Sequence, residues 1–241
     1  MEADEYRRMA EVEDAHWWYR ATRALLRQEI EPLLVPGGRF LDAGGGTGAT
    51  GAWLAEHGRL VACDAVAPAL VANRSLHPAL RAAAVGDLVH LPFQDDAFDL
   101  ALCVTVLYHQ AIADPVAAVR ELARTVRPGG VVVLMEPGVR RLRRAHDRVT
   151  HGARRFSRRD LRTVAESAGL VVQRATGAHS YLVPPAALKA VLERGEAASD
   201  LDGHQSGLGG VLGMVARAER AVLRRTALPA GLSVLVVARV P

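Results

Sequence analysis

Short apolar runs alternate with amphipathic stretches through the first part of the chain, from Arg39 to Glu136. Each run is only a few residues long and rich in Val, Leu and Ala, which is typical of buried strands. Because a crossover helix returns the chain to the same edge of a sheet, the alternation predicts parallel strands with helices on both faces. The predicted strands are 39–43, 60–64, 82–86, 98–105 and 131–136, and the predicted helices between them are 50–57, 68–76 and 115–126.

The pattern continues on either side of this stretch. Before it, residues 14–34 predict a helical segment. After it, a helix is expected at 157–168, where Ser157 is a good N-cap residue. Two more strands are expected at 170–175 and 233–239. The chain is therefore predicted to fold as an α/β protein with a doubly wound, mostly parallel seven-stranded sheet.

An insert separates the last two predicted strands. It contains an apolar helix at 185–192, a loop rich in Gly, Ser and Asp at 195–210, and an amphipathic helix at 211–225. On the amphipathic helix one stripe is apolar and the arginines face elsewhere. The stripe consists of Val211, Val215, Ala218 and Val222, and the arginines are Arg217, Arg220 and Arg224.

These patterns divide the chain into four parts. The first is an N-terminal helical cap, and the second is the α/β core. The third is a helical insert on the substrate side, and the last is the final strand of the core. Their expected bounds are 1–38, 39–179, 180–228 and 229–241.

Composition narrows the class of protein. The chain has 241 residues, 50% of them hydrophobic and 23% charged, which is ordinary for a globular protein and excludes a disordered chain. No apolar run approaches the roughly 20 residues of a membrane-spanning helix. The acidic N-terminus lacks a secretory signal pattern. Cys63 and Cys103 fall inside predicted strands and show no metal-binding spacing, which favours reduced core thiols, no metal site and a cytoplasmic location.

The net charge of +4 does not by itself indicate a nucleic-acid partner. All but one of the 30 basic residues are arginine, the exception being Lys189. The densest basic stretch, 140–159, has no interleaved aromatic residues on which bases could stack. We expect a small-molecule partner and no nucleic acid. A peripheral membrane contact and the oligomeric state stay open.

A glycine-rich loop carries the first chemical signal. The run LDAGGGTG at 41–48 leaves a predicted strand and enters a helix. Glycines let the backbone turn sharply and approach a ligand closely, and the N–H groups at the helix start suit a polar or negative group. Such a loop can also be a plain turn, so it needs support from elsewhere in the chain.

Carboxylates at the next two strand ends supply that support. Asp64 ends the second strand about 20 residues after the loop, where it can accept both hydroxyls of a ribose. Asp87 follows the third strand, where it can accept from an adenine amino group. A dinucleotide is the rival ligand, because GTGATG at 46–51 fits its pattern. Asp42, however, would repel a pyrophosphate, and no second mononucleotide-binding half follows. A positively charged adenosine ligand without phosphate fits better.

The combination resembles the Rossmann-like class I S-adenosylmethionine-dependent methyltransferases, of the methyltransferase type 11 kind. The matching runs are DAGGGTG at 42–48, Asp64, GDLVHLPF at 86–93, FDLA at 98–101 and RPGG at 127–130. The resemblance implies that S-adenosyl-L-methionine is the methyl donor and S-adenosyl-L-homocysteine the product. It also implies which residues hold this cofactor, namely Asp42, Gly44 and Gly46 at the methionine part, Asp64 and Ala65 at the ribose, Asp87 and Leu88 at the adenine, and Thr105 near the sulfonium.

The opening run EDAHWWYR at 13–20 resembles the "HWW" helix that precedes the fold in a subset of these enzymes. The resemblance implies that Trp17 and Tyr19 close over the cofactor and that Arg20 pairs with its carboxylate. Aromatic faces near a sulfonium would add cation–π attraction. The alternative is a hydrophobic anchor for a terminal helix.

A general base is required only if the acceptor must lose a proton. His109, after the fourth strand, is the candidate, because an imidazole titrates near neutrality. His16, His146, His151 and His179 are weaker candidates. Loop packing is the alternative role for each of them.

The insert is rich in apolar residues. This favours a small-molecule acceptor with an apolar body, such as a natural product, an isoprenoid or a lipid-like molecule, although the same residues could simply pack the insert onto the sheet. A non-catalytic binding partner for the cofactor, and an RNA or protein methyltransferase, stay open as alternatives. The apolar residues are Leu182, Val183, Pro184, Pro185, Leu188 and Val191.

Overall fold

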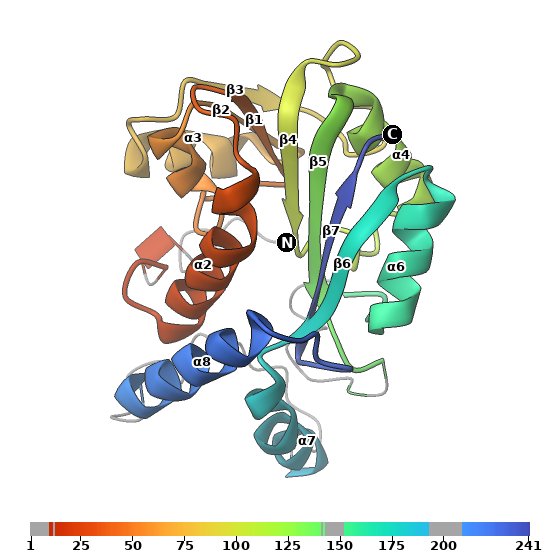
Figure 1. Ribbon diagram of the computed structural model, residues 1–241. Helices are drawn as coiled ribbons and strands as arrows, with labels where there is room; N and C mark the ends of the chain where they lie inside the picture. The colour runs from red at the N-terminus through yellow and green to blue at the C-terminus, as the bar shows by residue number, and fades with distance from the viewer. Residues whose placement is uncertain (1–9, 12, 141, 143–151, 193–208) are drawn as a thin grey trace.

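A computed structural model describes the chain except residues 1–9, 12, 141, 143–151 and 193–208. Its centre is one seven-stranded sheet with the strand order β3-β2-β1-β4-β5-β7-β6 (Figure 1). The strands are β1 (Arg39–Ala43), β2 (Arg59–Asp64), β3 (Ala82–Val85), β4 (Phe98–Val104), β5 (Val126–Pro137), β6 (Val171–Ala178) and β7 (Ser233–Arg239).

Only β7 runs against its neighbours. The pairs β1–β2, β2–β3, β1–β4 and β4–β5 are parallel, whereas β7 is antiparallel to both β5 and β6. The prediction of a doubly wound, mostly parallel seven-stranded sheet is therefore confirmed. Parallel strands end at a common edge, so the segments after β1, β2, β4 and β5 meet there.

Most strand bounds follow the apolar runs closely, although β6 continues to Ala178, beyond the expected 170–175, and β5 differs more. β5 begins at Val126 rather than at Val131, because Val126 pairs with Phe98 before a register shift in β4. The turn between these two positions contains Gly129 at a φ of 74°, a left-handed conformation that suits glycine. The predicted strand therefore covered only the regular part of β5.

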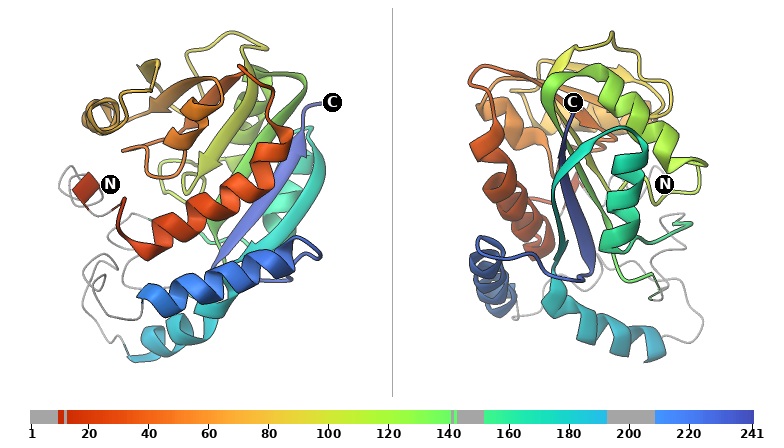
Figure 2. Two further views of the ribbon diagram at one scale, coloured as in Figure 1. Left: turned by 60° about the vertical axis from the view of Figure 1, so that its left-hand side comes forward. Right: turned by 45° about the vertical axis from the view of Figure 1, so that its right-hand side comes forward.

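Helices cover both faces of the sheet. One face carries α2 (Trp17–Ile30), the 3₁₀ helix η2 (Ala52–Glu56) and α3 (Ala67–Leu76), and the other carries α4 (Pro115–Thr125) and α6 (Arg158–Ser167) (Figures 1 and 2). In place of the helix expected at 50–57, the chain forms the shorter 3₁₀ helix η2 before β2 begins at Arg59. A further 3₁₀ turn, η1 (Glu31–Leu33), extends α2.

The alternation of side chains along each strand builds two cores. Phe40 of β1 packs with Leu25 and Leu26 of α2, whereas Leu41, the next residue, packs with Leu122 of α4. All four of these leucines and Phe40 are almost completely buried. Successive side chains of a strand point to opposite faces, which is why one apolar run can supply both cores.

The insert between β6 and β7 forms η3 (Ser180–Leu182), α7 (Val183–Leu192) and α8 (Gly209–Leu223). Figure 1 shows α7 and α8 beyond the end of the sheet at which β4 finishes. Both figures place α8 beside α2, and the two helices are in contact. The described residues contain no helix that is both long enough and apolar enough to cross a membrane.

The apolar stripe expected on the last helix does not face the core. Val211, Val215 and Val222 are 49%, 37% and 45% exposed, whereas Ala216 and Leu223 are buried. α8 is held by Leu223, which packs in the apolar core, and by two polar contacts: Gln28 donates to the carbonyl of Arg220, and Arg174 donates to the carbonyl of Leu223. Small residues then face α2, because they let the two helices approach closely.

The two cysteines are buried and form no disulfide. Burial raises the pKa of the Cys63 thiol to about 12 and raises the pKa of the Cys103 thiol as well. Both groups are therefore held as neutral thiols inside the sheet, as predicted.

The start of α6 provides a direct test of a local prediction. Ser157 and Asp160 form a capping box, in which each side chain accepts from the backbone N–H of the other residue. Replacing Ser157 with Ala is expected to lower the free energy of unfolding by about 1 kcal/mol, because an N–H at the helix start loses its acceptor. Urea denaturation measures this change.

Ser167 provides the matched control, since it is exposed in the last turn of the same helix. The S167A variant is expected to stay within about 0.5 kcal/mol of the wild type. Equal destabilisation by the two substitutions would contradict a specific role for the cap.

Candidate cofactor and acceptor site

The glycine loop turns tightly at the end of β1. Gly44, Gly46 and Gly48 have φ values of 72°, 51° and 94°, all in the left-handed region. A Cβ on Gly44 would lie 2.2 Å from Val106 Cγ2, so no side chain fits there. The N–H groups of Gly44 and Gly45 donate to the carbonyl of Cys63, which holds the loop against the end of β2.

Asp64 lies beside this loop, where the sequence predicted it. Its Oδ2 accepts from the N–H of Gly46 at 2.9 Å, and its Oδ1 accepts from the N–H of Val66 at 2.9 Å. The side chain is buried, and this burial raises its pKa above the ordinary value. A carboxylate offers about four lone-pair positions, so both oxygens retain capacity for a diol such as a ribose.

Asp42 is a buried carboxylate at the base of the loop. It is 2% exposed, and its Oδ2 has no hydrogen-bond partner among the described residues. A Cβ on Gly51 would lie 2.2 Å from this oxygen, so the carboxylate lies directly against the loop backbone. Burial, and next the charge of Asp64, raise the pKa of Asp42 to about 7, against the opposing effect of His77.

This pair of carboxylates fits the cofactor that the sequence predicted. A buried acceptor without a donor costs free energy, which a ligand amine can recover by donating to it. Two carboxylates at neighbouring strand ends disfavour a pyrophosphate and favour a cationic ligand with hydroxyl groups. S-adenosylmethionine carries an amine, a sulfonium and a ribose, so the donor set of this ligand matches the acceptors present.

A third strand-end carboxylate, Glu136, was missed by the sequence analysis. It accepts from the N–H groups of Val106, Leu107 and Tyr108 at 3.1, 2.8 and 3.1 Å. Burial raises its pKa to about 8, while these backbone donors act in the opposite direction. The sequence does contain an indication of this role, because Glu136 is the acidic residue that ends the apolar run at 131–136.

Glu136 thereby shapes the segment after β4, which lies opposite the glycine loop. Thr105 has a φ of 55°, an uncommon conformation for a threonine, and its N–H donates to the carbonyl of Met135. Val106, which contacts Gly44, directly follows it. Thr105 therefore directly precedes the residue that contacts the glycine loop, and its role near the sulfonium stays a prediction.

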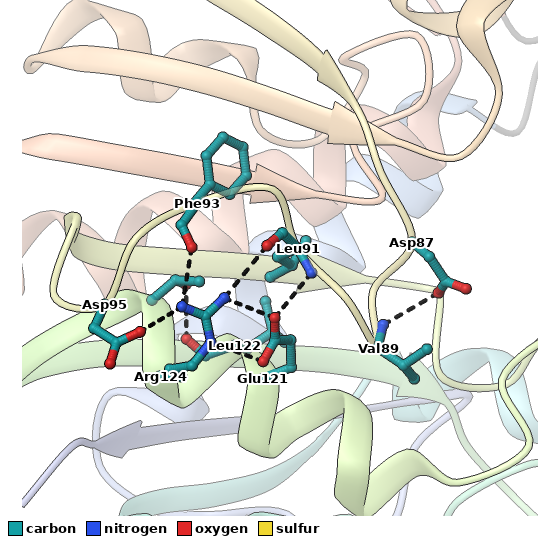
Figure 3. Close-up of polar contacts among 9 residues, drawn as sticks. Asp87, Val89, Leu91, Phe93, Asp95, Glu121, Leu122 and Arg124 are labelled. Carbon is teal, nitrogen blue, oxygen red and sulfur yellow. Dashed lines mark hydrogen bonds and ion pairs between the residues drawn. The ribbon is translucent and has the colours of Figure 1, made fainter.

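Asp87 and Leu88 follow β3, at the start of a segment that hydrogen bonds from α4 hold in place. Asp87 is exposed and its Oδ1 accepts from the N–H of Val89, whereas Leu88 is buried. Figure 3 shows how Glu121 and Arg124 of α4 hold the chain that follows. Glu121 accepts from the N–H of Leu91, and Arg124 donates to the carbonyls of Leu91 and Phe93 and to Asp95. The exposed carboxylate of Asp87 is thus available to a ligand.

The segment before α2 packs on the glycine loop through residues that the sequence analysis did not single out. Glu13 is 1% exposed and accepts from the hydroxyl of Thr47. Its other oxygen lies 3.5 Å from Nε2 of His77. Arg23 donates to the carbonyls of Ala49 and Glu13. The N-terminal segment therefore does close over the loop, through Glu13 and Arg23.

The three predicted N-terminal ligands lie on other surfaces of the same segment. Trp17 and Arg20 line a groove between α2 and α8, and Tyr19 is buried with its ring 5.0 Å from that of Trp18. The assignment of Trp17, Tyr19 and Arg20 to the cofactor stays a prediction. It requires these side chains to turn toward the glycine loop when the cofactor binds.

His109 lies in the loop after β4, and its Nδ1 accepts from the N–H of Ala111 at 3.1 Å. In this arrangement the neutral ring carries its proton on Nε2, which then donates rather than accepts. His16 caps α2 through its own Nδ1, and His179 is buried beside Ser233. His146 and His151 lie outside the described residues.

Part of the basic stretch at 140–159 has a structural role. Arg154 donates to the carbonyls of Leu107 and Ile112, and Arg155 donates to the carbonyl of Gly138. These arginines hold the segments after β4 and β5 in place. They are therefore not a free basic surface.

Comparison with known proteins agrees with this geometry. A family model described as a methyltransferase domain matches residues 41–134. A demethylmenaquinone methyltransferase of Mycobacterium marinum is 38% identical over 122 residues, which are 50% of this chain and 48% of that protein. A malonyl-[acyl-carrier protein] O-methyltransferase of Serratia marcescens is 36% identical over 120 residues, 48% of this chain and 46% of that protein. This chain thus spans about half the length of the curated relatives it matches.

Solved structures share the fold over most of the chain. The [4+2]-cyclase SpnF superimposes with a TM-score of 0.61 at 22% identity, covering 92% of this chain and 81% of that chain. Phosphoethanolamine N-methyltransferase 2 of Haemonchus contortus, in complex with S-adenosyl-L-methionine, has a TM-score of 0.60 at 18% identity, covering 91% of this chain and 52% of that chain. Such low identities establish the fold alone.

The domain match, the strand order and the strand-end carboxylates all agree. Residues 41–134 of the chain are thus similar to a methyltransferase domain, and the acceptors at the strand ends match the donor groups of S-adenosylmethionine.

Proposed function

We propose that this protein transfers a methyl group from S-adenosylmethionine to a small-molecule acceptor with an apolar body, such as a natural product, an isoprenoid or a lipid-like molecule. The observation that carries the transfer from S-adenosylmethionine is the buried oxygen of Asp42 at the base of the glycine loop, which has no hydrogen-bond partner among the described residues. When bound, the cofactor supplies a methyl group already activated by a sulfonium. The chain itself then has to orient two ligands and exclude water.

Each carboxylate has its own part in that orientation. Asp42 accepts from the amine of the cofactor, and Asp64 with Ala65 holds the ribose. Asp87 and Leu88 bind the adenine, one through its exposed carboxylate and the other through its buried apolar side chain. Glu136 acts as a positioning residue, because it fixes the backbone that carries Thr105 and Val106.

The acceptor class rests on this chain's own insert, since the relatives are named for different acceptors. Leu188 of α7 is 62% exposed, and Val211 and Met214 of α8 are 49% and 55% exposed. The insert is an addition to a fold that many proteins share, and such additions often determine which ligand is bound. Exposed apolar side chains on the insert therefore favour an apolar ligand.

His109 is proposed to contact the acceptor through Nε2, which is buried in this structure and has to become exposed for that contact. With Nδ1 engaged by Ala111, the neutral ring donates from Nε2 and orients an acceptor oxygen. Proton abstraction by the same nitrogen would require the hydrogen bond to Ala111 to open. The geometry therefore favours an orienting role over that of a general base.

A second chemistry on this fold is represented by SpnF, which is named a cyclase rather than a methyltransferase. A fold accommodates different reactions, so the methyl transfer has to be measured on this chain. A cofactor-binding partner without turnover is the corresponding alternative, and an RNA or protein acceptor is a further one.

Turnover is tested by the formation of S-adenosylhomocysteine in the presence of apolar acceptors, followed by mass spectrometry of the acceptor. The wild type is expected to form the product, and D64N is expected to bind S-adenosylhomocysteine at least about tenfold more weakly, because an amide accepts fewer hydrogen bonds than a carboxylate. Calorimetric titration measures this affinity.

The control for this variant is D114N, since Asp114 caps α4 and Asn is an equally good cap. D114N is expected to retain the wild-type affinity. Cofactor binding without any acceptor methylation would support the non-catalytic alternative, and methylation of RNA or protein alone would contradict the small-molecule acceptor.

The pKa of Asp42 predicts how cofactor affinity depends on pH. With a pKa of about 7, Asp42 is mostly protonated at pH 6 and mostly ionised at pH 7.5. A ligand ammonium group binds the ionised form, so affinity for S-adenosylhomocysteine is expected to rise by up to about tenfold across this range. The amine of the ligand stays charged there, because α-amino groups titrate near pH 8.

D42N separates this effect from other titrations. The variant is expected to bind more weakly and to lose the rise in affinity with pH. Parallel pH profiles for the wild type and D42N would remove Asp42 from the amine site.

Glu136 predicts a coupled loss of stability and binding. In E136Q one oxygen becomes an amide nitrogen that cannot accept, so the N–H of Val106, Leu107 or Tyr108 loses its partner. We expect a loss of about 1–3 kcal/mol in the free energy of unfolding and a weaker affinity for S-adenosylhomocysteine. Urea denaturation and calorimetry measure the two effects.

Glu166 offers a matched control, because it is exposed and paired only with Arg162 on the same helix. E166Q is expected to change stability by less than about 0.5 kcal/mol and to leave cofactor affinity unchanged. If E136Q behaved like E166Q, the positioning role of Glu136 would be wrong.

A further inference from the structure

A groove of about 440 Å³ lies between α2 and α8, outside the glycine loop. Its lining includes Trp17 and small residues from both helices, among them Ala21, Gly213 and Ala216. Both views in Figure 2 show the two helices that form its sides. The volume is sufficient for a small ligand or for part of a larger one.

Three arginines line this groove: Arg20 from α2, and Arg217 and Arg220 from α8. We refer to it as the arginine groove. Within the part of the chain that the structure describes, none of the three guanidinium groups forms an ion pair with a carboxylate. Glu219, the acid next to Arg220 in sequence, instead accepts from the N–H groups of His179 and Ser180.

The concentration of positive charge has an energetic cost. Burial, together with the charges of Arg217 and Arg224, lowers the pKa of Arg220. Like charges in a partly buried groove repel each other, and an anion bound there relieves this repulsion. Guanidinium groups bind carboxylate and phosphate oxygens with paired hydrogen bonds, so an oxyanion is the ligand chemistry that fits.

The arginine groove adjoins the cofactor loop through one stretch of chain. Ala15 and Trp17 line the groove, and Glu13, just before them, accepts from Thr47 of the loop. Arg23, one turn after Arg20, donates to the carbonyl of Ala49. A ligand in the groove would therefore lie against the same segment that covers the cofactor loop.

Apolar surface also lines the groove itself. Ala21, Ala24 and Ala216 line it, and Trp17, which is partly exposed, adds an aromatic face. An anion with an apolar body would use both the charge and this surface.

We propose that the arginine groove binds the oxyanion head, a phosphate or a carboxylate, of an amphiphilic acceptor. The proposal specifies the acceptor further, as an apolar molecule that carries an anionic group. In that respect it rests on the proposed function. Binding of the head group is a property of the groove itself, so it is measured without cofactor and without turnover.

The test is calorimetric titration of the full chain with octyl phosphate, sodium octanoate and inorganic phosphate at low salt. Octyl phosphate or octanoate is expected to bind, and inorganic phosphate is expected to bind more weakly because it lacks the apolar body. The tighter of the two octyl compounds identifies the head group. The double variant R217Q/R220Q is expected to weaken the tighter ligand at least about tenfold, and R20Q, on the other helix, is expected to weaken it as well.

Arg225 provides the matched control, because it follows α8 and is exposed away from the groove lining. R225Q is expected to bind like the wild type. The proposal is overturned if neither octyl compound binds, if R225Q weakens binding as much as R217Q/R220Q, or if inorganic phosphate binds as tightly as octyl phosphate. Formation of S-adenosylhomocysteine with an uncharged acceptor would refute the groove's role and leave the proposed methyl transfer intact.

Discussion

Three carboxylates, those of Asp42, Asp64 and Glu136, lie buried where parallel strands end, and burial raises the pKa of each of them. An isolated buried carboxylate is costly, so each needs hydrogen-bond donors. Asp64 and Glu136 obtain them from backbone N–H groups of the loops that they support. Asp42 retains one oxygen without a donor among the described residues, and this makes it the point at which a ligand contributes most.

The arrangement depends on the parallel sheet. Because β1, β2, β4 and β5 run in one direction, the segments that follow them meet at one edge. Each carboxylate then holds a loop from a different strand: Asp64 of β2 holds the loop after β1, and Glu136 of β5 holds the loop after β4. The two loops lie against each other where Gly44 meets Val106.

Two segments outside the sheet, the N-terminal segment and the insert, add further residues around the strand ends. The N-terminal segment contributes Glu13 and Arg23 to the glycine loop and Trp17 and Arg20 to the arginine groove. The insert contributes α8, with Arg217 and Arg220 on the groove and apolar side chains on its outer surface. The proposed cofactor site thus lies on the core, while the proposed acceptor surfaces lie on the N-terminal segment and the insert.

The sequence by itself determined the strands, the glycine loop and the positions of Asp42, Asp64 and Asp87. These features are local, since an apolar run of strand length or a glycine at a strand end has the same meaning wherever the strand lies. Only the tertiary structure decided which face of α8 is buried, that Glu13 and Arg23 reach the glycine loop, and that Glu136 holds the loop after β4. Each of these depends on contacts between segments far apart in the chain. The buried side chain of Leu223 and the hydrogen bonds from Gln28 and Arg174 hold α8 in an orientation that leaves its apolar stripe exposed.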